Sequence, residues 1–181
     1  MKKEPTDRGK ALALKLFSHY EHHISIELLL KRVLGYPSMN NSYEFTGLHC
    51  ACMFGLVEIA RVLIEMDDVD INCMDYTDAT PLIWAARNGH EEVVQLLLGR
   101  EDLNPDMLDR FGQAPILWAA KHGHEAVVKL LLGRGDANPN RPDNDGQTLI
   151  SWAAMNGHDG VVEAIPISQI LVARHQSRGL P

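Results

Sequence analysis

Apolar and polar positions along the chain recur with a period of 34 residues. The segment at residues 80–90 recurs at 114–124 and 148–158, and a more divergent copy covers 46–55. One glycine of each copy marks the period, because successive members lie 34 residues apart: Gly55, Gly89, Gly123 and Gly157. A repeat of this length is typical of a solenoid, in which each unit buries its apolar face only against its neighbours.

Each copy predicts two short helices joined by a tight turn. Thr80 followed by Pro81 is typical of a helix start, since threonine caps free amides and proline fits the first turn. The alanine pair at 85–86 allows the next unit to approach closely, and Gly89 ends the helix. A second helix with one apolar side follows at 93–98, and a loop rich in Gly, Asn, Pro and Asp closes the unit. The pattern predicts an all-α solenoid of stacked helix–turn–helix units with hairpin or loop fingers.

The copies resemble the ankyrin-repeat family over about residues 41–165. Residues 80–85, Thr-Pro-Leu-Ile-Trp-Ala, approximate the family signature Thr-Pro-Leu-His-x-Ala, and His49 stands at the histidine position of that signature. The period is one residue longer than the usual 33. The segments Trp-Ala-Ala and Asn-Gly-His-Glu are also similar to the ankyrin tails of fungal NACHT-type receptor proteins.

The register divides the chain into seven segments. They are a disordered tail at 1–8, a degenerate N-terminal capping repeat at 9–40, repeats at 41–74, 75–108 and 109–142, a partial fourth repeat at 143–166, and a divergent C-terminal segment at 167–181. Pro166 replaces the apolar residue that ends the second helix in other copies, so this helix is expected to break there. Residues 167–174 are apolar, and either fold back over the fourth repeat or pair with a second copy in a homodimer.

Charge and composition narrow the class of partner. The 181 residues carry a net charge of −7, with acidic residues such as Asp143 in the connecting segments, and this field would repel nucleic acid. No apolar run approaches the roughly 20 residues of a membrane-spanning helix, and the first residues do not form a signal peptide. The three cysteines, Cys50, Cys52 and Cys73, are an odd number and indicate reduced thiols in a cytoplasmic protein.

Candidate chemistry is limited to side chains that recur with the repeat. Equivalent positions of packed helices lie about 8–10 Å apart, whereas metal ligands must converge on one point. The recurring histidines are therefore predicted to bond adjacent loops, and the recurring tryptophans to pack between units; these are His90, His124 and His158, and Trp84, Trp118 and Trp152. Cys50 and Cys52 beside His49 have no second ligand pair, so we expect no metal, no cofactor and no catalytic residue.

The resemblance implies that another protein is held by the finger tips and the exposed side of each first helix, which together line a concave face. Aromatic side chains beside arginine are favoured anchors of such interfaces. The candidate partner-binding residues are Tyr43, Phe45, Met53, Phe54, Tyr76, Arg87, Asn88, Arg110, Phe111, Gln113, Lys121, His122, Asn144, Met155 and Asn156. The sequence thus predicts a protein–protein interaction scaffold.

Two other functions are compatible with the sequence. One is a small fungal biosynthetic enzyme, a cyclase or isomerase, with a pocket on the scaffold and one or two acid–base groups such as His49 or His122. The other is a truncated receptor tail with no role of its own. A deep apolar cavity would favour the enzyme, and an open groove would favour the scaffold.

Overall fold

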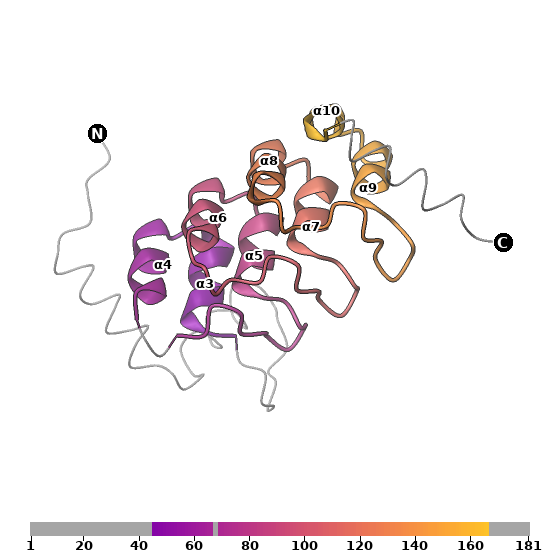
Figure 1. Cartoon of the computed structure of the whole chain (residues 1–181). Helices are drawn as coiled ribbons and strands as arrows, with labels where there is room; N and C mark the ends of the chain where they lie inside the picture. The colour runs from indigo at the N-terminus through magenta and orange to yellow at the C-terminus, as the bar shows by residue number, and fades with distance from the viewer. Residues whose placement is uncertain (1–44, 67–68, 167–181) are drawn as a thin grey trace.

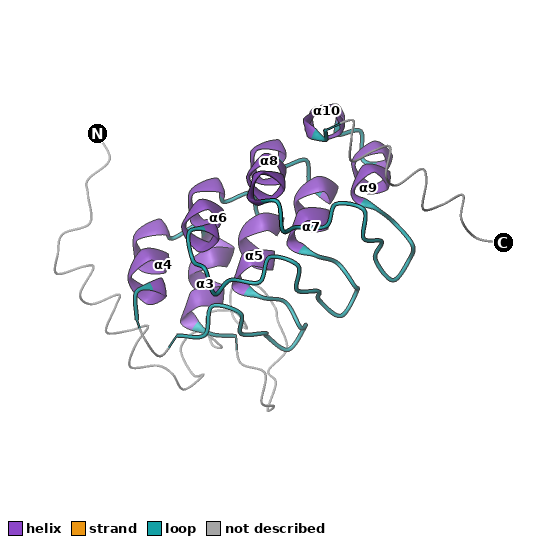
Figure 2. Cartoon of the chain, in the orientation of Figure 1, coloured by secondary structure: helices purple, strands orange, loops and turns teal. Residues whose placement is uncertain are grey.

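The computed structural model describes residues 45–66 and 69–166, and within these ranges all regular secondary structure is helical (Figures 1 and 2). The helices form four consecutive pairs: α3 (Gly47–Phe54) with α4 (Val57–Ile64), α5 (Pro81–Arg87) with α6 (Glu91–Leu98), α7 (Pro115–Lys121) with α8 (Glu125–Arg134), and α9 (Leu149–Met155) with α10 (Asp159–Ala164). The prediction of an all-α solenoid of helix–turn–helix units is confirmed.

The helices lie in two rows. The inner helices α3, α5, α7 and α9 pack side by side in chain order, and the outer helices α4, α6, α8 and α10 pack behind them (Figure 1). Fully buried side chains such as Leu82, Leu117, Val93 and Val127 fill the space between the rows. The loops that join one pair to the next project from the inner row as fingers (Figure 2). The fingers at 75–80, 109–114 and 143–148 are called the second, third and fourth, after the helix pair that each precedes. We call the surface made by the fingers and the inner helices the concave face.

The inner helices begin as the sequence predicts, with one exception. Thr80 Oγ1 accepts a hydrogen bond from the Ile83 amide at 3.3 Å, and Thr46 and Thr148 cap α3 and α9 in the same way. Ala114 occupies this position before α7 and has no side chain that could cap the helix. The first turn of α7 therefore lacks one hydrogen bond that the other inner helices have.

The recurring histidines join each pair of helices to the pair before it. The Nε2 atoms of His90 and His124 each lie 3.0 Å from a backbone carbonyl of the preceding inner helix, that of Met53 and that of Arg87. Gly89 has φ +72°, and a Cβ there would come within 2.5 Å of the His124 ring, so only glycine fits beneath the histidine. The histidines do bond adjacent units, as predicted, but the acceptor is a carbonyl at the end of a helix and not, as expected, one of a loop.

The fourth pair is shortened at its end. Helix α10 ends at Ala164, and Ile165 has extended backbone angles directly before Pro166. This agrees with the expected break at the proline. The tail, the capping repeat and the C-terminal segment at 167–181 lie outside the described residues. The boundaries of these segments and of the repeats stay predictions. The homodimer also stays a prediction.

Candidate functional site

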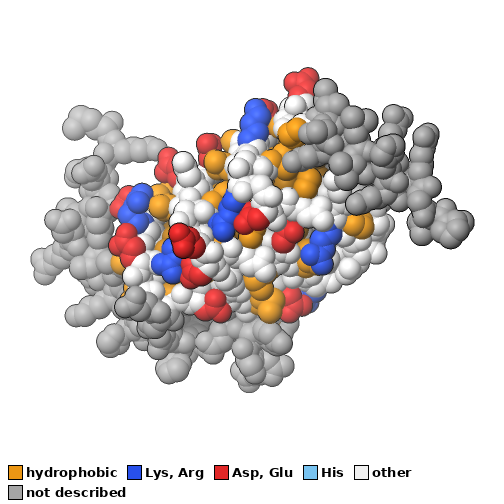
Figure 3. Space-filling model, viewed as in Figure 1, with side chains coloured by type: hydrophobic (Ala, Val, Ile, Leu, Met, Phe, Trp, Pro, Cys, Tyr) orange, Lys and Arg blue, Asp and Glu red, His pale blue; other side chains and the backbone are white. Residues whose placement is uncertain are grey.

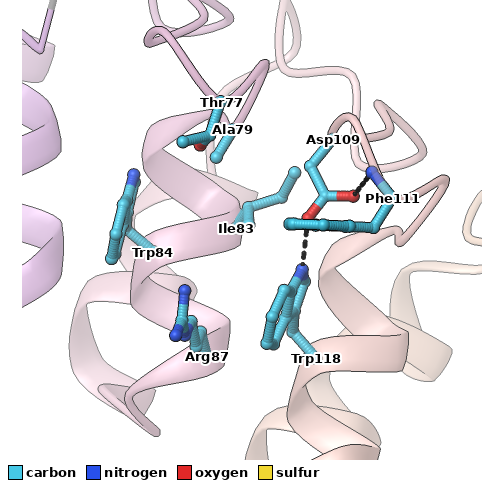
Figure 4. Close-up of a pocket in the computed structure, with 8 residues that line it drawn as sticks. All are labelled: Thr77, Ala79, Ile83, Trp84, Arg87, Asp109, Phe111 and Trp118. Carbon is cyan, nitrogen blue, oxygen red and sulfur yellow. Dashed lines mark hydrogen bonds between the residues drawn. The ribbon is translucent and has the colours of Figure 1, made fainter.

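Each of the three described fingers is fastened to its inner helix by a buried aspartate. Asp109 Oδ1 accepts hydrogen bonds from the backbone amides of Phe111 and Gln113, both at 2.9 Å, which close the finger turn. Asp109 Oδ2 accepts a hydrogen bond from Trp118 Nε1 at 2.8 Å (Figure 4). The same 2.8 Å bond joins Trp84 to Asp75 and Trp152 to Asp143. One carboxylate therefore fixes both the shape of the finger and its position over the helix.

Neighbouring fingers are also bonded to one another. The Arg110 amide donates to the Thr77 carbonyl at 3.1 Å, and the Asn144 amide donates to the Phe111 carbonyl at 3.1 Å. The Asn144 side-chain amide donates in addition to the Arg110 carbonyl. The second, third and fourth fingers thus form one continuous edge of the concave face.

A small pocket lies where the second and third fingers meet helices α5 and α7. Its volume is about 60 Å³, and its walls are mostly apolar. Figure 4 shows Arg87 on α5 between Trp84 of the same helix and Trp118 on α7, with Phe111 reaching from the finger to lie above Trp118. The remaining lining residues are Thr77, Ala79, Ile83 and Asp109. Small-molecule sites usually measure about 300–1,000 Å³, so this pocket has the size for one side chain of a partner.

Cations and indole rings alternate along the concave face. The Arg87 guanidinium carbon lies 5.4 Å from the ring centre of Trp84 and 4.4 Å from that of Trp118. Lys121 Nζ lies 4.8 Å from the Trp118 ring and 4.0 Å from the Trp152 ring. Such cation–π contacts are worth about 0.5–1 kcal/mol at exposed sites. They hold both positive charges at defined places on the surface. We call these five residues the cation–indole ladder.

The carboxylates of two adjacent fingers differ in pKa. Burial raises the pKa of Asp109, although hydrogen bonds from Gln113 and Trp118 act in the opposite direction. Burial also acts to raise the pKa of Asp143, but hydrogen bonds from Gln147, Gln113 and Trp152 outweigh it and leave this pKa below its ordinary value. Asp143 therefore stays ionised more readily than Asp109.

Gln113 is a structural residue, and its prediction as an exposed partner-binding residue is wrong. Its side chain is only 3% exposed, and its Nε2 donates to Asp143 Oδ2 at 2.9 Å. Asp143 lies in a connecting segment, as predicted, but it is only 6% exposed and is bonded to the finger and to Trp152. Both side chains hold adjacent fingers together.

Most other predicted site residues lie on the concave side with varied exposure. The exposed ones are Phe54, Asn88, Arg110, Phe111, His122, Asn144, Met155 and Asn156, and the partly buried ones are Phe45, Met53, Tyr76, Arg87 and Lys121. The structure brings Arg87 and Phe111 together at the pocket, and places the Arg110 guanidinium 5.9 Å from the Tyr76 ring. Phe54 and Met155 belong to α3 and α9 and do not line the pocket. Tyr43 lies outside the described residues.

Three of the predicted residues also have a local structural role. Asn88 Nδ2 donates to the Trp84 carbonyl at 2.8 Å, and Asn156 makes the same bond to Trp152. His122 Nδ1 lies 3.1 Å from the Trp118 carbonyl. Each of these side chains adds a second contact to a tryptophan carbonyl that also accepts a hydrogen bond from the backbone amide of the same residue, as Trp84 does from Asn88 at 3.2 Å.

Sequence reasoning missed the aspartate that builds each finger and assigned the tryptophans to packing alone. Trp84 and Trp118 do belong to the core, as predicted, but they also line the pocket. The sequence does contain a signal for the hydrogen bond between aspartate and tryptophan. In three successive copies an aspartate precedes the tryptophan by nine residues, as in Asp109 and Trp118. Nothing in the sequence showed that this pair meets in space.

His49 is a structural residue of the first described repeat. It is fully buried; its Nε2 lies 3.1 Å from the Ala79 carbonyl, and its Nδ1 lies 3.1 Å from the Thr46 amide. Burial lowers the pKa of His49 to about 4. Both ring nitrogens are occupied, so His49 is not available as the acid–base group of an enzyme.

The cysteines surround His49 without forming a reactive centre. Burial raises the pKa of Cys50 and of Cys73 to about 11, so both thiols are protonated near neutral pH. All three cysteines are free thiols. In residues 45–66 and 69–166, no group of three His, Cys, Asp or Glu side chains is arranged to hold a metal ion.

The paired helices, the two rows and the fastened fingers define a helical repeat scaffold with a concave face. A family model described as ankyrin repeats, with three copies, matches residues 14–107 and 100–169. The chain belongs to the ankyrin-repeat family. A search of curated proteins found no match. In the part of the chain that the structure describes, every helix is too short or too polar to cross a bilayer.

Proposed function

We propose that this protein is an interaction scaffold that binds another protein through its concave face. Ankyrin repeats are generally protein-interaction modules, which supports the class of function. The observation that carries the choice of surface is Phe111, whose side chain is 55% exposed at the mouth of the pocket, next to the exposed Arg110. Exposed aromatic and arginine side chains around a pocket are typical of interface hot spots.

The described pocket gives no support to the enzyme alternative. Its volume of about 60 Å³ is several times smaller than a usual substrate site. A nucleic-acid partner is not favoured either, because the chain carries a net charge of −7. On the face seen in Figure 3, acidic and basic side chains are interspersed, as on many protein-binding surfaces.

We further propose a cytoplasmic location and a relation to the ankyrin tails of fungal NACHT-type receptors. The location is supported by three cysteines that are all free thiols, which a reducing compartment maintains. The relation to receptor tails rests on the repeat segments Trp-Ala-Ala, Asn-Gly-His-Glu and Gly-Arg-x-Asp-x-Asn-Pro. Light scattering on the purified chain tests the proposed homodimer, for which a monomer mass would be the contrary result.

Affinity enrichment with matched variants tests the proposed surface. The full chain and an Arg110→Ala/Phe111→Ala variant are immobilised, and captured proteins are quantified by mass spectrometry. A control variant, Glu92→Ala/Gln95→Ala, changes two exposed residues of the outer helix α6. We expect at least one protein to be lost at least fivefold with the concave-face variant and retained by the control. If every captured protein is retained by both variants, the concave face is not the binding surface.

A further inference from the structure

Two cations of the concave face, Arg87 and Lys121, form no ion pair with a carboxylate among the described residues. The ion pairs of the described residues are Arg100–Asp102, Arg134–Asp136 and Lys129–Glu125. Arg87 and Lys121 each lie over two indole rings of the cation–indole ladder. Asp109 interacts electrostatically with Arg87, but its oxygens already accept hydrogen bonds from Phe111, Gln113 and Trp118. Both charges are therefore open to a carboxylate from outside.

The spacing of these cations matches an extended protein chain. Arg87 and Lys121 end the adjacent inner helices α5 and α7 at equivalent positions of the repeat. Packed helices lie about 8–10 Å apart, and an extended segment in the polyproline II conformation rises about 3.1 Å per residue with three residues per turn. Carboxylates at positions i and i+3 of such a segment lie on the same side, about 9 Å apart, and therefore reach both cations.

The pocket beside Arg87 favours a partner that also carries an apolar side chain at this place. Its walls include Ile83, Trp84, Phe111 and Trp118, and its volume of about 60 Å³ exceeds the roughly 10–15 Å³ that one water needs. A small aliphatic side chain fits this space and this lining. Since Arg87 is itself part of the lining, such a side chain would lie next to the carboxylate that pairs with Arg87.

We propose that the partner presents an extended segment with acidic residues at positions i and i+3 and a small aliphatic residue beside the first of them. This inference rests on the proposed function and specifies its partner. The acidic chain as a whole argues for a carboxylate-bearing peptide over a phosphate backbone, because the net charge of −7 opposes a polyanion with one charge at every unit. Arg87 and Lys121 favour a partner whose carboxylates have the same spacing as these two cations.

Fluorescence anisotropy with three labelled twelve-residue peptides tests this specificity. The first peptide repeats Glu-Val-Thr, the second has the same composition with its glutamates clustered at one end, and the third repeats Gln-Val-Thr. We expect the full chain to bind the first peptide at least fivefold more tightly than the second and at least tenfold more tightly than the third. Equal affinities, or no binding of the first peptide up to millimolar concentration, would overturn the inference.

Charge variants of the full chain locate the binding. Arg87→Gln/Lys121→Gln is expected to weaken binding of the first peptide at least tenfold. Arg61→Gln/Arg141→Gln removes the same charge from two exposed positions outside the pocket, and is expected to change affinity less than twofold. Arg87→Lys/Lys121→Arg keeps both charges and should bind nearly as well as the unmodified chain. An equal loss in the Arg61/Arg141 variant would contradict the proposed contacts.

Two further results separate this inference from the proposed function. If a single-stranded oligonucleotide displaces the first peptide at equal concentration, the face recognises phosphate and the carboxylate inference fails. If the enrichment experiment finds proteins that depend on Arg110 and Phe111, but the three peptides bind alike, the scaffold function stands and the acidic segment is wrong. Circular dichroism and thermal unfolding of each variant exclude a loss of fold as the cause.

Discussion

The third and fourth helix pairs share the segment Trp-Ala-Ala followed by Gly-His, but they have different surroundings. Ala120 of α7 is fully buried, whereas Ala154 at the equivalent position of α9 is exposed. Trp118 is 7% exposed, and Trp152 is only partly buried. Among the described helices, α7 packs between α5 and α9, but α9 has only α7 beside it in the inner row. A repeat therefore owes much of its burial to the repeat that follows it.

The same difference affects the candidate site. The Trp118 ring has a cation from its own helix and a cation from the preceding helix, Lys121 and Arg87. The Trp152 ring has only Lys121 within this distance in the described structure. The pocket likewise lies between two complete neighbours, α5 and α7. The most fully formed part of the concave face is in the middle of the stack.

The largest expected effect comes from a matched pair of core truncations. Ile116→Ala in α7 removes a side chain that is 2% exposed, and should lower the free energy of unfolding by about 2–5 kcal/mol through lost burial and a cavity. Ile150→Ala at the equivalent, partly buried position of α9 should cost about half as much or less. Urea unfolding of both variants measures the two losses. Equal losses would show that the end repeat is as well covered as the third.

The stability of the first described repeat should depend on pH, because the next finger covers His49. This repeat therefore provides a second case in which a following repeat buries a side chain. Folded His49 has a pKa of about 4, against 6.5 for the exposed side chain, so between these pH values the unfolded chain binds a proton that the folded chain does not. The contribution of neutral His49 to the free energy of unfolding is fully present above about pH 6.5. It falls as the pH decreases toward 4, by roughly 3 kcal/mol in all. Urea unfolding at pH 7.0, 5.5 and 4.5 should show this decline.

A substitution at His49 serves as the control for the pH effect. Ile83 and Leu117 hold the equivalent position in the next two repeats, so leucine suits this place in the fold. His49→Leu should remove most of the decline between pH 6.5 and 4.5, whatever its effect on stability at neutral pH. An unchanged pH dependence in this variant would mean that other groups cause the acid sensitivity.

Enlarging an alanine of the inner helices should produce a smaller change in stability, and this change should differ clearly between the third and fourth repeats. Ala120→Leu places three additional carbons where the side chain is fully buried between inner helices, and should cost about 1–3 kcal/mol. Ala154→Leu makes the same change at an exposed position and should alter stability by less than about 0.5 kcal/mol. Thermal unfolding of the two variants measures the contrast. A comparable loss at Ala154 would indicate that something covers α9.

The smallest effect is a gain at the start of α7. Ala114→Thr restores the cap that the other inner helices have, and should stabilise the fold by about 1 kcal/mol. Thr80, the equivalent residue before α5, is 2% exposed, which shows that a threonine fits at such a position. Thr148→Ala is the reverse change and should cost a similar amount. A destabilised Ala114→Thr variant would mean that the third repeat has no room for the added atoms.

The repeat itself was predictable from sequence because its signals are local. Thr80 marks a helix start and Gly89 a helix end through the conformations they favour, and the 34-residue period then aligns every copy. The bonds of His90 and His124 also followed from the period, since equivalent residues in a stack meet only their immediate neighbours. These features depend on one repeat and its repetition.

The candidate site was predictable only in part because it depends on contacts between fingers and helices. The resemblance predicts Arg87 and Phe111 as partner-binding residues, but their meeting at one pocket depends on how the third finger lies over α5. Gln113 has the polar side chain of a surface residue, and its burial results from Asp143 in the next finger. Aspartate is a common loop residue, so the sequence around Asp109 predicts only a loop. In the structure its carboxylate accepts a hydrogen bond from the indole of Trp118 in the helix that follows.

The most direct test of the central claim is amide chemical-shift mapping of the full chain with a protein that the enrichment experiment recovers. The account predicts that the shifted amides concentrate in the second and third fingers, near Thr77 and Phe111, and at the ends of α5 and α7, near Arg87 and Lys121. The outer helices α6 and α8 should change little. Shifts confined to α6 and α8, with the fingers unchanged, would contradict the account.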